Sequence, residues 1–236
     1  MIHISTLIDF VRNDKSQQEC LQALAEHRKG DLEMYIQSGI FYIPPIEQAD
    51  EWAYLCEQTG KTLEDFGVTE ENRHLLDDGF ILPVQDADGY VLFYLNHNFL
   101  RDKSMKYLNV NTPLAPNTQQ VKLYGLHNTK QALEEDRVFV LEGYFDARRL
   151  EYSGFPATAP LGTKIMPYHI NYYHRFRNVY YVQDNDKSGE MAYLKFKKEV
   201  PHAMRITMPS GFKDADMLGG EHPQKYAQWL ATLPTL

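Results

Sequence analysis

Three carboxylates follow two apolar runs of the sequence. Val138–Leu141 is followed by Glu142, and Val179–Val182 is followed shortly by Asp184 and Asp186. Each run is short, β-branched and aromatic, which is typical of a buried strand. Because ligands of open α/β sheets bind beyond the carboxyl ends of the strands, we expect these acids to lie together at one edge of a sheet. The side chains of Asp184 and Asp186 point the same way if the backbone between them is extended.

This grouping of acids predicts a cation site. Carboxylates that are brought together repel one another and are unfavourable to desolvate unless a cation neutralises them. Hard oxygen ligands indicate Mg²⁺ or Mn²⁺ rather than zinc. Two such ions about 4 Å apart can bind both the attacking and the leaving oxygen of a phosphoryl transfer.

Four short motifs follow one another in the second half of the chain. In chain order they are Glu142-Gly143-Tyr144-Phe145-Asp146, Leu161-Gly162-Thr163, Asp184-Asn185-Asp186-Lys187-Ser188-Gly189 and Lys213-Asp214-Ala215-Asp216. A single acid-any-acid triplet is usually a solvated turn, whereas the ordered set is far more specific. The set resembles the TOPRIM family, and most closely the version in bacterial and phage DnaG-type DNA primases. The resemblance implies a mainly parallel, Rossmann-like sheet.

Three stretches before these motifs extend the resemblance to the primase subdomain that precedes the TOPRIM domain. Two apolar runs between Phe80 and Leu95 flank a polar turn that contains Gly89, which predicts a β-hairpin. The other two stretches are Lys106-Tyr107-Leu108-Asn109 and Leu123-Tyr124-Gly125-Leu126. The resemblance therefore runs from about Phe80 to about Leu218, more than half of the chain.

The resemblance also implies roles for individual residues. Glu142, Asp184 and Asp186 would be catalytic metal ligands, and Glu142 would also serve as a general acid or base. Asp214 and Asp146 would be further metal ligands. The residues implied to contact nucleotide or template are Lys106, Asn109, Gly143, Gly162 and Thr163. The implied reaction joins ribonucleoside triphosphates into a short RNA primer on a single-stranded DNA template, with release of pyrophosphate.

The predicted fold class is α/β, or α+β overall, in two domains. Residues 1–130 are predicted to form an amino-terminal primase-like subdomain, in which 1–76 are mostly helical and unrecognised and 80–126 are primase-like. Residues 131–236 are predicted to form the TOPRIM domain, because strand and helix patterns alternate there. Within the first domain, Ser16-Gln17-Gln18-Glu19 has the spacing of a capping box and predicts a helix that runs to about Lys29.

Composition limits the kinds of surface that the chain presents. It has 236 residues, of which 43% are hydrophobic, enough for a sizeable core. The net charge of -8 argues against a broad basic surface for nucleic acid but leaves room for a local groove. The arginines that the family carries ahead of its lysine motif are replaced by Asp77-Asp78-Gly79 and Asn96-His97-Asn98, which should weaken template binding.

The sequence predicts a cytoplasmic protein. No apolar run reaches the ~20 residues of a membrane span, and Met1–Phe10 lacks the basic start and long apolar region of a signal peptide. Cys20 and Cys56 are isolated and are expected to be reduced. We find no counterpart of the zinc-binding and helicase-binding domains of the family. The chain is thus either a minimal or excised catalytic core, or a replicative helicase and a zinc-binding partner protein supply those roles.

Two other functions are compatible with the acids. A TOPRIM nuclease would use the same metal site, and only the Lys106 and Leu123 motifs argue for a primase over it. A non-catalytic binding module in a replication complex would fit the missing arginines and the negative net charge. Retention of every acidic ligand argues against the module, since like charges held together without a metal are a liability. A topoisomerase would need a nucleophilic tyrosine in a separate domain, for which the chain is too short.

We predict that Lys106→Ala weakens the use of nucleotide or template while the fold stays intact. The family places this lysine in the catalytic cleft, where its positive charge would neutralise phosphate. The expected result is a higher KM for ribonucleoside triphosphates or for template in a primer-synthesis assay, with an unchanged melting temperature. Wild-type kinetics in the variant would reject the role implied for Lys106.

Overall fold

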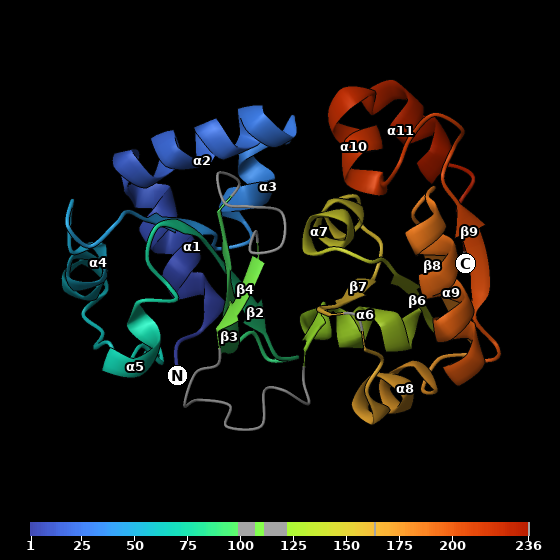
Figure 1. The fold of residues 1–236 in the computed structure, drawn as a ribbon, viewed down its shortest axis with the longest axis horizontal. Helices are drawn as coiled ribbons and strands as arrows, with labels where there is room; N and C mark the ends of the chain where they lie inside the picture. Colours follow the sequence, from blue (N-terminus) through green and yellow to red (C-terminus); the bar gives the residue numbers. More distant parts are fainter. Residues whose placement is uncertain (99–106, 111–121, 163, 236) are drawn as a thin grey trace. The chain divides into compact units, whose positions relative to one another are not determined.

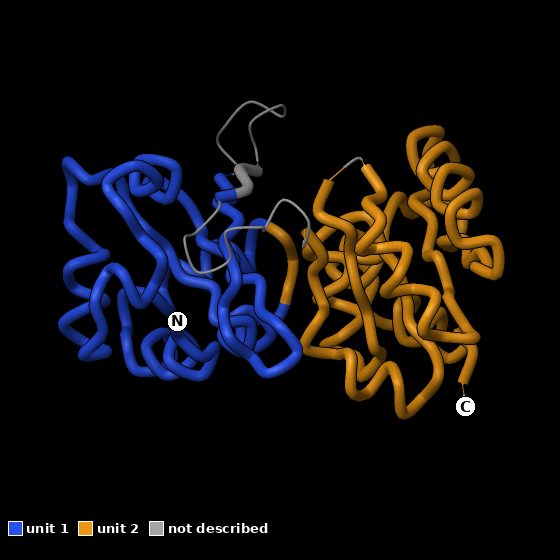
Figure 2. The backbone as a smooth tube through the Cα atoms, turned by 90° about the horizontal axis from the view of Figure 1, so that it is seen from below, with its two compact units in different colours: residues 1–27, 31–119 blue, residues 28–30, 120–236 orange. Residues whose placement is uncertain are grey.

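The computed structural model describes residues 1–98, 107–110, 122–162 and 164–235 (Figure 1). They form two compact units, one of residues 1–27 and 31–119 and the other of residues 28–30 and 120–236 (Figure 2). The division lies before the boundary predicted near residue 130. It does so because Leu123–Tyr124 forms strand β5, which pairs antiparallel with β7 (Ala157–Pro160) of the second unit.

The first unit combines a four-stranded antiparallel sheet with helices. The sheet has the order β1-β2-β3-β4. Residues before 76 are mostly helical, as predicted, apart from the short strand β1 (Phe41–Ile43). The helices of this part are α1 (Ile4–Asn13), α2 (Lys15–Arg28), α3 (Leu32–Ile36), α4 (Glu51–Thr59) and α5 (Glu70–Arg73).

The predicted hairpin is confirmed. Strands β2 (Gly79–Gln85) and β3 (Val91–His97) pair antiparallel, and β4 (Tyr107–Val110) pairs with β3. The turn between β2 and β3 requires glycine, because Gly89 has φ +85° and a Cβ atom there would lie 2.6 Å from Nε2 of His3. The N–H of Ile4 donates to the carbonyl of Gly89 at 2.8 Å, which fastens the amino terminus of the chain to the hairpin.

Helix α2 (Lys15–Arg28) begins two residues earlier than its sequence motif indicates. The Oδ1 atom of Asp14 accepts a hydrogen bond from the backbone N–H of Gln17 at 2.9 Å. The predicted capping box at Ser16 is therefore wrong in its capping residue, although the helix itself is present. Asp and Ser are comparable N-caps, so composition alone could not choose between the two residues.

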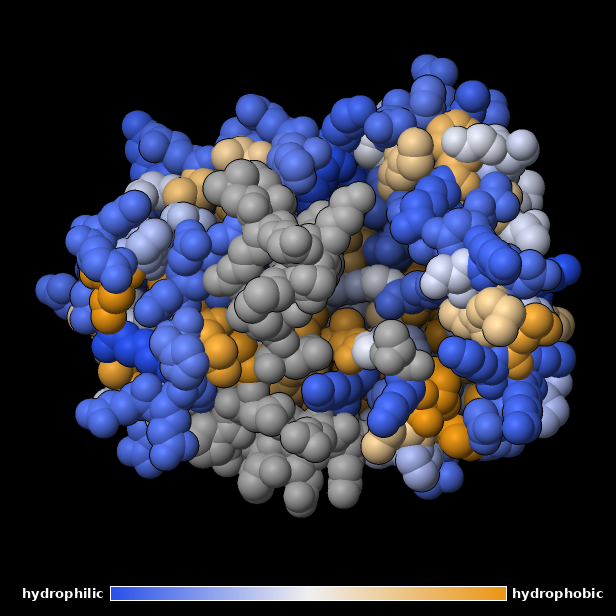
Figure 3. All heavy atoms as spheres, in the orientation of Figure 1, coloured by the Kyte–Doolittle hydropathy of each residue, from blue (hydrophilic) through white to orange (hydrophobic). Residues whose placement is uncertain are grey.

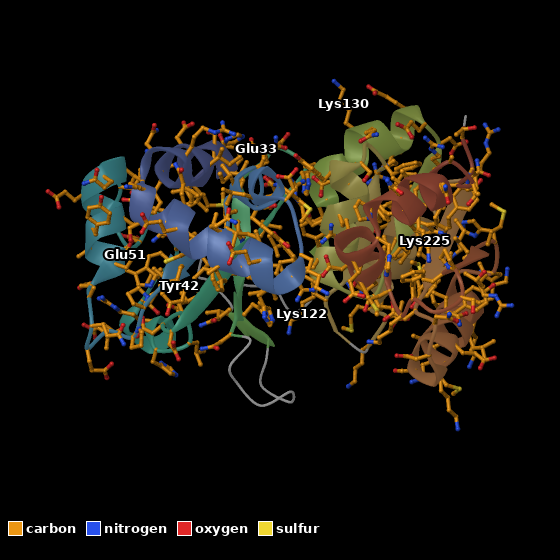
Figure 4. The ribbon with its side chains drawn as sticks, turned by 90° about the horizontal axis from the view of Figure 1, so that it is seen from above. Glu33, Tyr42, Glu51, Lys122, Lys130 and Lys225 are labelled. Atoms are coloured by element: carbon orange, nitrogen blue, oxygen red, sulfur yellow. The ribbon has the colours of Figure 1, made fainter. Side chains whose placement is uncertain are left out.

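Gln17 joins α2 to the sheet of the first unit. Its side chain is 2% exposed, and it donates to the carbonyl of Tyr42 at 3.0 Å and to Glu51 at 2.7 Å. It also accepts from the N–H of Tyr42 at 2.8 Å. Figure 4 labels Tyr42 and Glu51, the two residues that this buried amide joins. The amide therefore satisfies the polar groups that β1 and α4 bring into the core.

The second unit contains a five-stranded sheet with the order β5-β7-β6-β8-β9, which is parallel apart from the β5–β7 pair. Its remaining strands are β6 (Arg137–Val140), β8 (Asn178–Gln183) and β9 (Met204–Thr207). The helical elements are η3 (Leu126–Asn128), α6 (Thr129–Glu134), α7 (Tyr144–Tyr152), α8 (Pro167–Tyr173), α9 (Lys187–Glu199), α10 (Ala215–Glu221) and α11 (Pro223–Leu230). The mainly parallel sheet agrees with the predicted fold class.

The two central strands, β6 and β8, are parallel neighbours, as predicted, with Val138 opposite Val179. Side chains alternate between the two faces of the sheet. The ring of Tyr180 stacks on Phe139 at 5.1 Å, whereas the ring of Tyr181 packs against Phe196 of α9 at 4.9 Å. Burial on both faces explains why the two strands read as continuous apolar runs.

The described surface is mostly polar on the face that Figure 3 shows, where hydrophilic residues are blue. None of the helices in the described part of the chain is both long and apolar enough to cross a membrane.

A buried carboxylate on α7 anchors the stretch that contains β5. Glu151 accepts hydrogen bonds from the hydroxyl of Tyr124 and, at 2.7 Å, from Nη1 of Arg148. Nε2 of His127 lies 2.9 Å from the same carboxylate. Burial alone would raise the pKa of Glu151, but His127, Arg148 and the Tyr124 hydroxyl lower it to about 2. The Leu123-Tyr124-Gly125-Leu126 motif is thus held to α7 by an ionised side chain.

We predict that Glu151→Gln lowers the free energy of unfolding by about 2–4 kcal/mol at pH 7, because Arg148 loses a buried partner. A carboxyl with a depressed folded-state pKa contributes stability above its unfolded pKa and loses that contribution as the pH falls through the folded value. The difference between wild type and variant should therefore be full above about pH 5 and shrink between about pH 4.5 and 2. Urea unfolding at several pH values measures it.

Glu134→Gln is the matched control for this prediction, because Glu134 is exposed on α6. Its unfolding free energy should stay within ~0.5 kcal/mol of wild type at every pH. A Glu151→Gln difference that does not shrink on acidification would contradict the ionised state assigned to Glu151.

Candidate active site

The predicted acids gather beyond the carboxyl ends of β6 and β8 in the second unit. Glu142 lies two residues after β6, and Asp184 follows β8 directly. The Oε1 atom of Glu142 is buried and has no hydrogen-bond partner among the described residues. Burial raises the pKa of Glu142, an effect that a backbone hydrogen bond from Asp184 opposes. The structure thus holds a carboxylate oxygen that nothing in the described chain neutralises directly.

Two further acids combine a structural and a site role. Asp186 is the N-cap of α9 and accepts from the N–H of Gly189 through Oδ1 at 2.8 Å. Asp214 is the N-cap of α10 and accepts from the N–H of Met217 through Oδ1 at 2.8 Å. In both residues the other oxygen, Oδ2, remains for the acidic cluster. Each helix start therefore fixes one carboxylate in place.

The ammonium group of Lys213 lies among these carboxylates. Its Nζ atom is 3.8 Å from Oδ2 of Asp184, 3.6 Å from Oδ2 of Asp186 and 3.9 Å from Oδ2 of Asp214. The main chain of the same residue joins the two acidic loops, because the N–H of Asn185 donates to the carbonyl of Lys213 at 2.6 Å. Glu142, Asp184, Asp186 and Asp214, together with Lys213, are called the carboxylate cluster below.

Electrostatics in the carboxylate cluster disfavour full ionisation. Burial, followed by the charges of Glu142 and Asp214, raises the pKa of Asp184 to about 7. Burial would lower the pKa of Lys213, but Asp184 and the neighbouring acids outweigh it, so the pKa of this ammonium is raised. The single lysine charge therefore offsets only part of the repulsion among the acids.

Asp146, the fifth predicted ligand, is partly used elsewhere. It lies on α7, and its Oδ1 atom accepts a hydrogen bond from the backbone N–H of Asp216 at 2.9 Å. Burial and the nearby acids Asp214, Asp216 and Asp184 raise its pKa well above the ordinary value. Gly143 permits this arrangement, since a Cβ atom there would lie 2.6 Å from Oδ2 of Asp146. Asp146 therefore links α7 to the start of α10.

Asp216 is neutralised by two arginines. Its side chain is 8% exposed, and Nε of Arg149 donates to Oδ1 at 2.8 Å, while Arg28 forms an ion pair with Oδ2. The guanidinium of Arg28 also lies 3.9 Å above the ring of Phe145. Gly219 leaves the room for this pairing, because a Cβ atom there would meet Cδ of Arg149 at 2.3 Å. This paired acid holds α10 in position rather than presenting a free oxygen.

A cavity of about 350 Å³ opens beside Glu142. Apolar and polar side chains both line it, and the polar ones come from the residue after Leu141, from β8 and from α9. The lining includes Glu142, Gly162, Ile165, Tyr181, Ser188 and Lys195. The position next to Glu142 provides space for a small organic molecule against the carboxylate cluster.

The structure brings four of the predicted acids together in the second unit. Gly143 is the N-cap of α7 and Gly162 follows β7, both in the second unit. Asn109 belongs to β4 of the first unit, opposite Leu95. Lys106 and Thr163 lie outside the described residues. Within the described ranges, no three His, Cys, Asp or Glu side chains are placed as a ready metal-binding group.

Sequence reasoning missed three charged residues of this region. Lys213 was visible inside the last acidic motif, but a lone lysine is normally a solvated side chain and gave no separate signal. Arg149 and Arg28 carried no signal either, since their partner Asp216 is far from both in the sequence. The pairing of Arg28 with Asp216 joins residues 188 positions apart, which spacing cannot predict.

Comparison with known proteins finds similarity to a Toprim-like family and to bacterial DNA primases. Residues 139–218 match the Toprim-like family. A DNA primase of Aquifex aeolicus is 33% identical over 119 residues, which are 48% of this chain and 23% of the relative. A DNA primase of Thermotoga maritima is 29% identical over 197 residues, 76% of this chain and 34% of the relative. The chain thus spans about a quarter to a third of the length of these relatives.

Solved structures share the fold. The RNA polymerase domain of Mycobacterium tuberculosis primase DnaG superimposes with a TM-score of 0.75 at 20% identity, over 97% of this chain and 82% of that one. Residues 139–218 therefore match the Toprim-like family, and the chain has the fold of the RNA polymerase domain of primase DnaG, in agreement with the resemblance seen in the sequence.

Proposed function

We propose that this chain is the catalytic core of a DnaG-type primase, which joins ribonucleoside triphosphates into short RNA primers on single-stranded DNA. The observation that carries the proposal is the carboxylate cluster at the carboxyl edge of a Toprim-like sheet. Phosphoryl transfer needs an in-line nucleophile and charge neutralisation more than covalent chemistry. A cluster of carboxylate oxygens that can hold a cation suits that demand.

The donor set fits a divalent cation. Glu142 contributes a buried oxygen without a partner, and Asp186 and Asp214 each keep one oxygen free of their helix caps. Carboxylate oxygens are the ligands that Mg²⁺ and Mn²⁺ prefer. We propose that Glu142, Asp184, Asp186 and Asp214 hold the metal. Asp146 is proposed as a further ligand through the carboxylate oxygen that does not accept from Asp216. Bound there, the metal would neutralise charge on the reacting phosphate groups.

The residues of the chain would divide the remaining work. Burial raises the pKa of Glu142, which brings it closer to the working range of a general acid or base. Gly143 lies after β6 and Gly162 after β7, where backbone can approach a nucleotide closely. Thr163 is proposed to contact the nucleotide with them. The cavity beside Glu142 would receive part of that nucleotide. Lys106 and Asn109 are proposed to contact nucleotide or template.

Partners and location follow from the same proposal. The template would be single-stranded DNA, and a replicative helicase or a zinc-binding partner protein would assist primer synthesis. A cytoplasmic location is supported by Cys20 and Cys56, which are both free thiols. The negative net charge restricts template binding to a local groove.

One assay tests the function. The chain is incubated with ribonucleoside triphosphates, single-stranded DNA and Mg²⁺ or Mn²⁺, and the products are separated by size. New short RNA strands support the primase. Shortening of the template would instead indicate a TOPRIM nuclease, and the absence of both products would indicate a binding module.

We predict that Asp184→Asn abolishes nucleotide transfer, because it removes a charge from the proposed metal site with little change in volume. The rise in melting temperature that Mg²⁺ or Mn²⁺ causes by mass action should also become smaller. Folding raises the pKa of Asp184 to about 7. Ionisation of Asp184 therefore lowers the stability of the folded state as the pH rises, and this loss is complete above about pH 7. At pH 8 the metal-free melting temperature of the variant should equal or exceed that of wild type.

Calorimetric titration, thermal melting and the primer assay measure these effects. Asp9→Asn is the control, since Asp9 is exposed on α1 in the other unit and should leave all three readouts unchanged. Ca²⁺ should bind yet fail to support turnover, because its longer and looser coordination misplaces the reacting oxygens. Full activity of Asp184→Asn, or no binding of either metal by wild type, rejects the site.

A further inference from the structure

Two acidic motifs of the second unit are neutralised in different ways. Asp216 is paired with Arg149 and Arg28 in a largely buried site, with Arg149 in direct contact at 2.8 Å. In the described part of the chain, the carboxylate cluster forms ion pairs with the ammonium of Lys213, whose side chain is 56% exposed. The first arrangement is permanent, since separating a buried pair leaves charges uncompensated. In the second arrangement, the exposed ammonium of Lys213 can leave the acids for solvent with little loss of free energy.

The distances around Lys213 support such an exchange. Its Nζ atom lies 3.6–3.9 Å from one oxygen of each of Asp184, Asp186 and Asp214, beyond the length of a direct hydrogen bond. The ammonium is thus shared among three carboxylates rather than bound to one. Its backbone is fixed independently, through the carbonyl that accepts from the N–H of Asn185. The side chain can therefore move without disturbing the loops that carry the acids.

We infer that Lys213 is the resident counter-ion of the carboxylate cluster and that a divalent cation displaces its ammonium group on binding. The exchange replaces the single positive charge of the ammonium by the double charge of the cation, among four acids whose repulsion the ammonium offsets only in part. Lys213 therefore competes with the metal and sets how tightly it binds. This role rests on the proposed metal site and adds to it a competitor supplied by the chain itself.

Binding measurements on charge variants test the competition. Lys213→Met removes the ammonium and keeps an unbranched apolar side chain, Lys213→Arg keeps the charge, and Lys130→Met makes the same charge change elsewhere. Lys130 is exposed on α6 and is labelled in Figure 4. Mg²⁺ affinity is measured by calorimetric titration, and melting temperature is measured with and without Mg²⁺.

The expected result is a metal-free melting temperature of Lys213→Met below that of wild type, because three carboxylates lose the ammonium that they share. Its Mg²⁺ affinity should rise by about tenfold, since the metal no longer has to displace an ammonium that three carboxylates attract from within ~4 Å. The Mg²⁺-induced rise in melting temperature should also be larger than in wild type. Lys213→Arg and Lys130→Met should stay near wild type. Unchanged or weaker Mg²⁺ binding by Lys213→Met overturns the inference.

A measurement on the wild-type chain avoids the variants altogether. Lysines are acetylated with a water-soluble reagent, and the modified positions are quantified by mass spectrometry. Saturating Mg²⁺ should raise the labelling of Lys213 several-fold and leave that of Lys130 unchanged. Unchanged or reduced labelling of Lys213, in a chain that binds Mg²⁺ by calorimetry, rejects displacement.

These readouts separate the two proposals, because neither depends on primer synthesis. A chain that binds Mg²⁺ and releases Lys213 but makes no primers rejects the proposed function and keeps the inference. A chain that makes primers while Lys213→Met binds Mg²⁺ no more tightly than wild type rejects the inference alone. Binding of Mg²⁺ by neither wild type nor Lys213→Met rejects both the metal site and the role of Lys213.

Discussion

Repulsion among carboxylates at the edge of one sheet is the constraint around which the second unit is built. Parallel pairing of β6 and β8 brings Glu142 and Asp184 to the same edge of the sheet. Because the backbone fixes both positions, a change of side-chain rotamer cannot separate the two acids completely. Burial raises the pKa of both acids. The fold must therefore stabilise an arrangement that electrostatics opposes. It does so with helix caps, a shared lysine and buried arginines.

The helix caps connect the site to the stability of the unit. Asp186 and Asp214 each give one oxygen to a helix start and the other to the carboxylate cluster. Gly189 lets α9 start close to the strand end, because a Cβ atom there would lie 2.3 Å from the carbonyl oxygen of Asp184. Capping energy, about 1 kcal/mol for such a residue, thus holds charges in place that would otherwise separate.

The sequence predicted the parts of this unit that depend on local pattern. The apolar runs identified β6 and β8, and the ordered motifs identified the acids that follow them. It could not predict interactions between distant positions, such as the pairing of Arg28 and Arg149 with Asp216. Nor did it reveal the role of Lys213, because the sequence of an acidic motif does not show whether its lysine faces solvent or the neighbouring acids. The prediction of Ser16 as the cap of α2 was wrong for a related reason, since Asp14 and Ser16 are equivalent candidates until the backbone is known.

The different treatment of two neighbouring acids separates structure from chemistry within one motif. Asp214 and Asp216 are two residues apart, yet Asp214 faces an exposed ammonium and Asp216 faces buried guanidinium groups. Arginine suits the buried position because its planar fork makes several directed contacts at once, whereas lysine is a point charge on a flexible stem. The choice of cation therefore decides which acid is fixed and which is exchangeable. The arginines hold α10 rigid, and that rigidity allows Asp214 to present an oxygen to the cluster while its lysine partner remains free to leave.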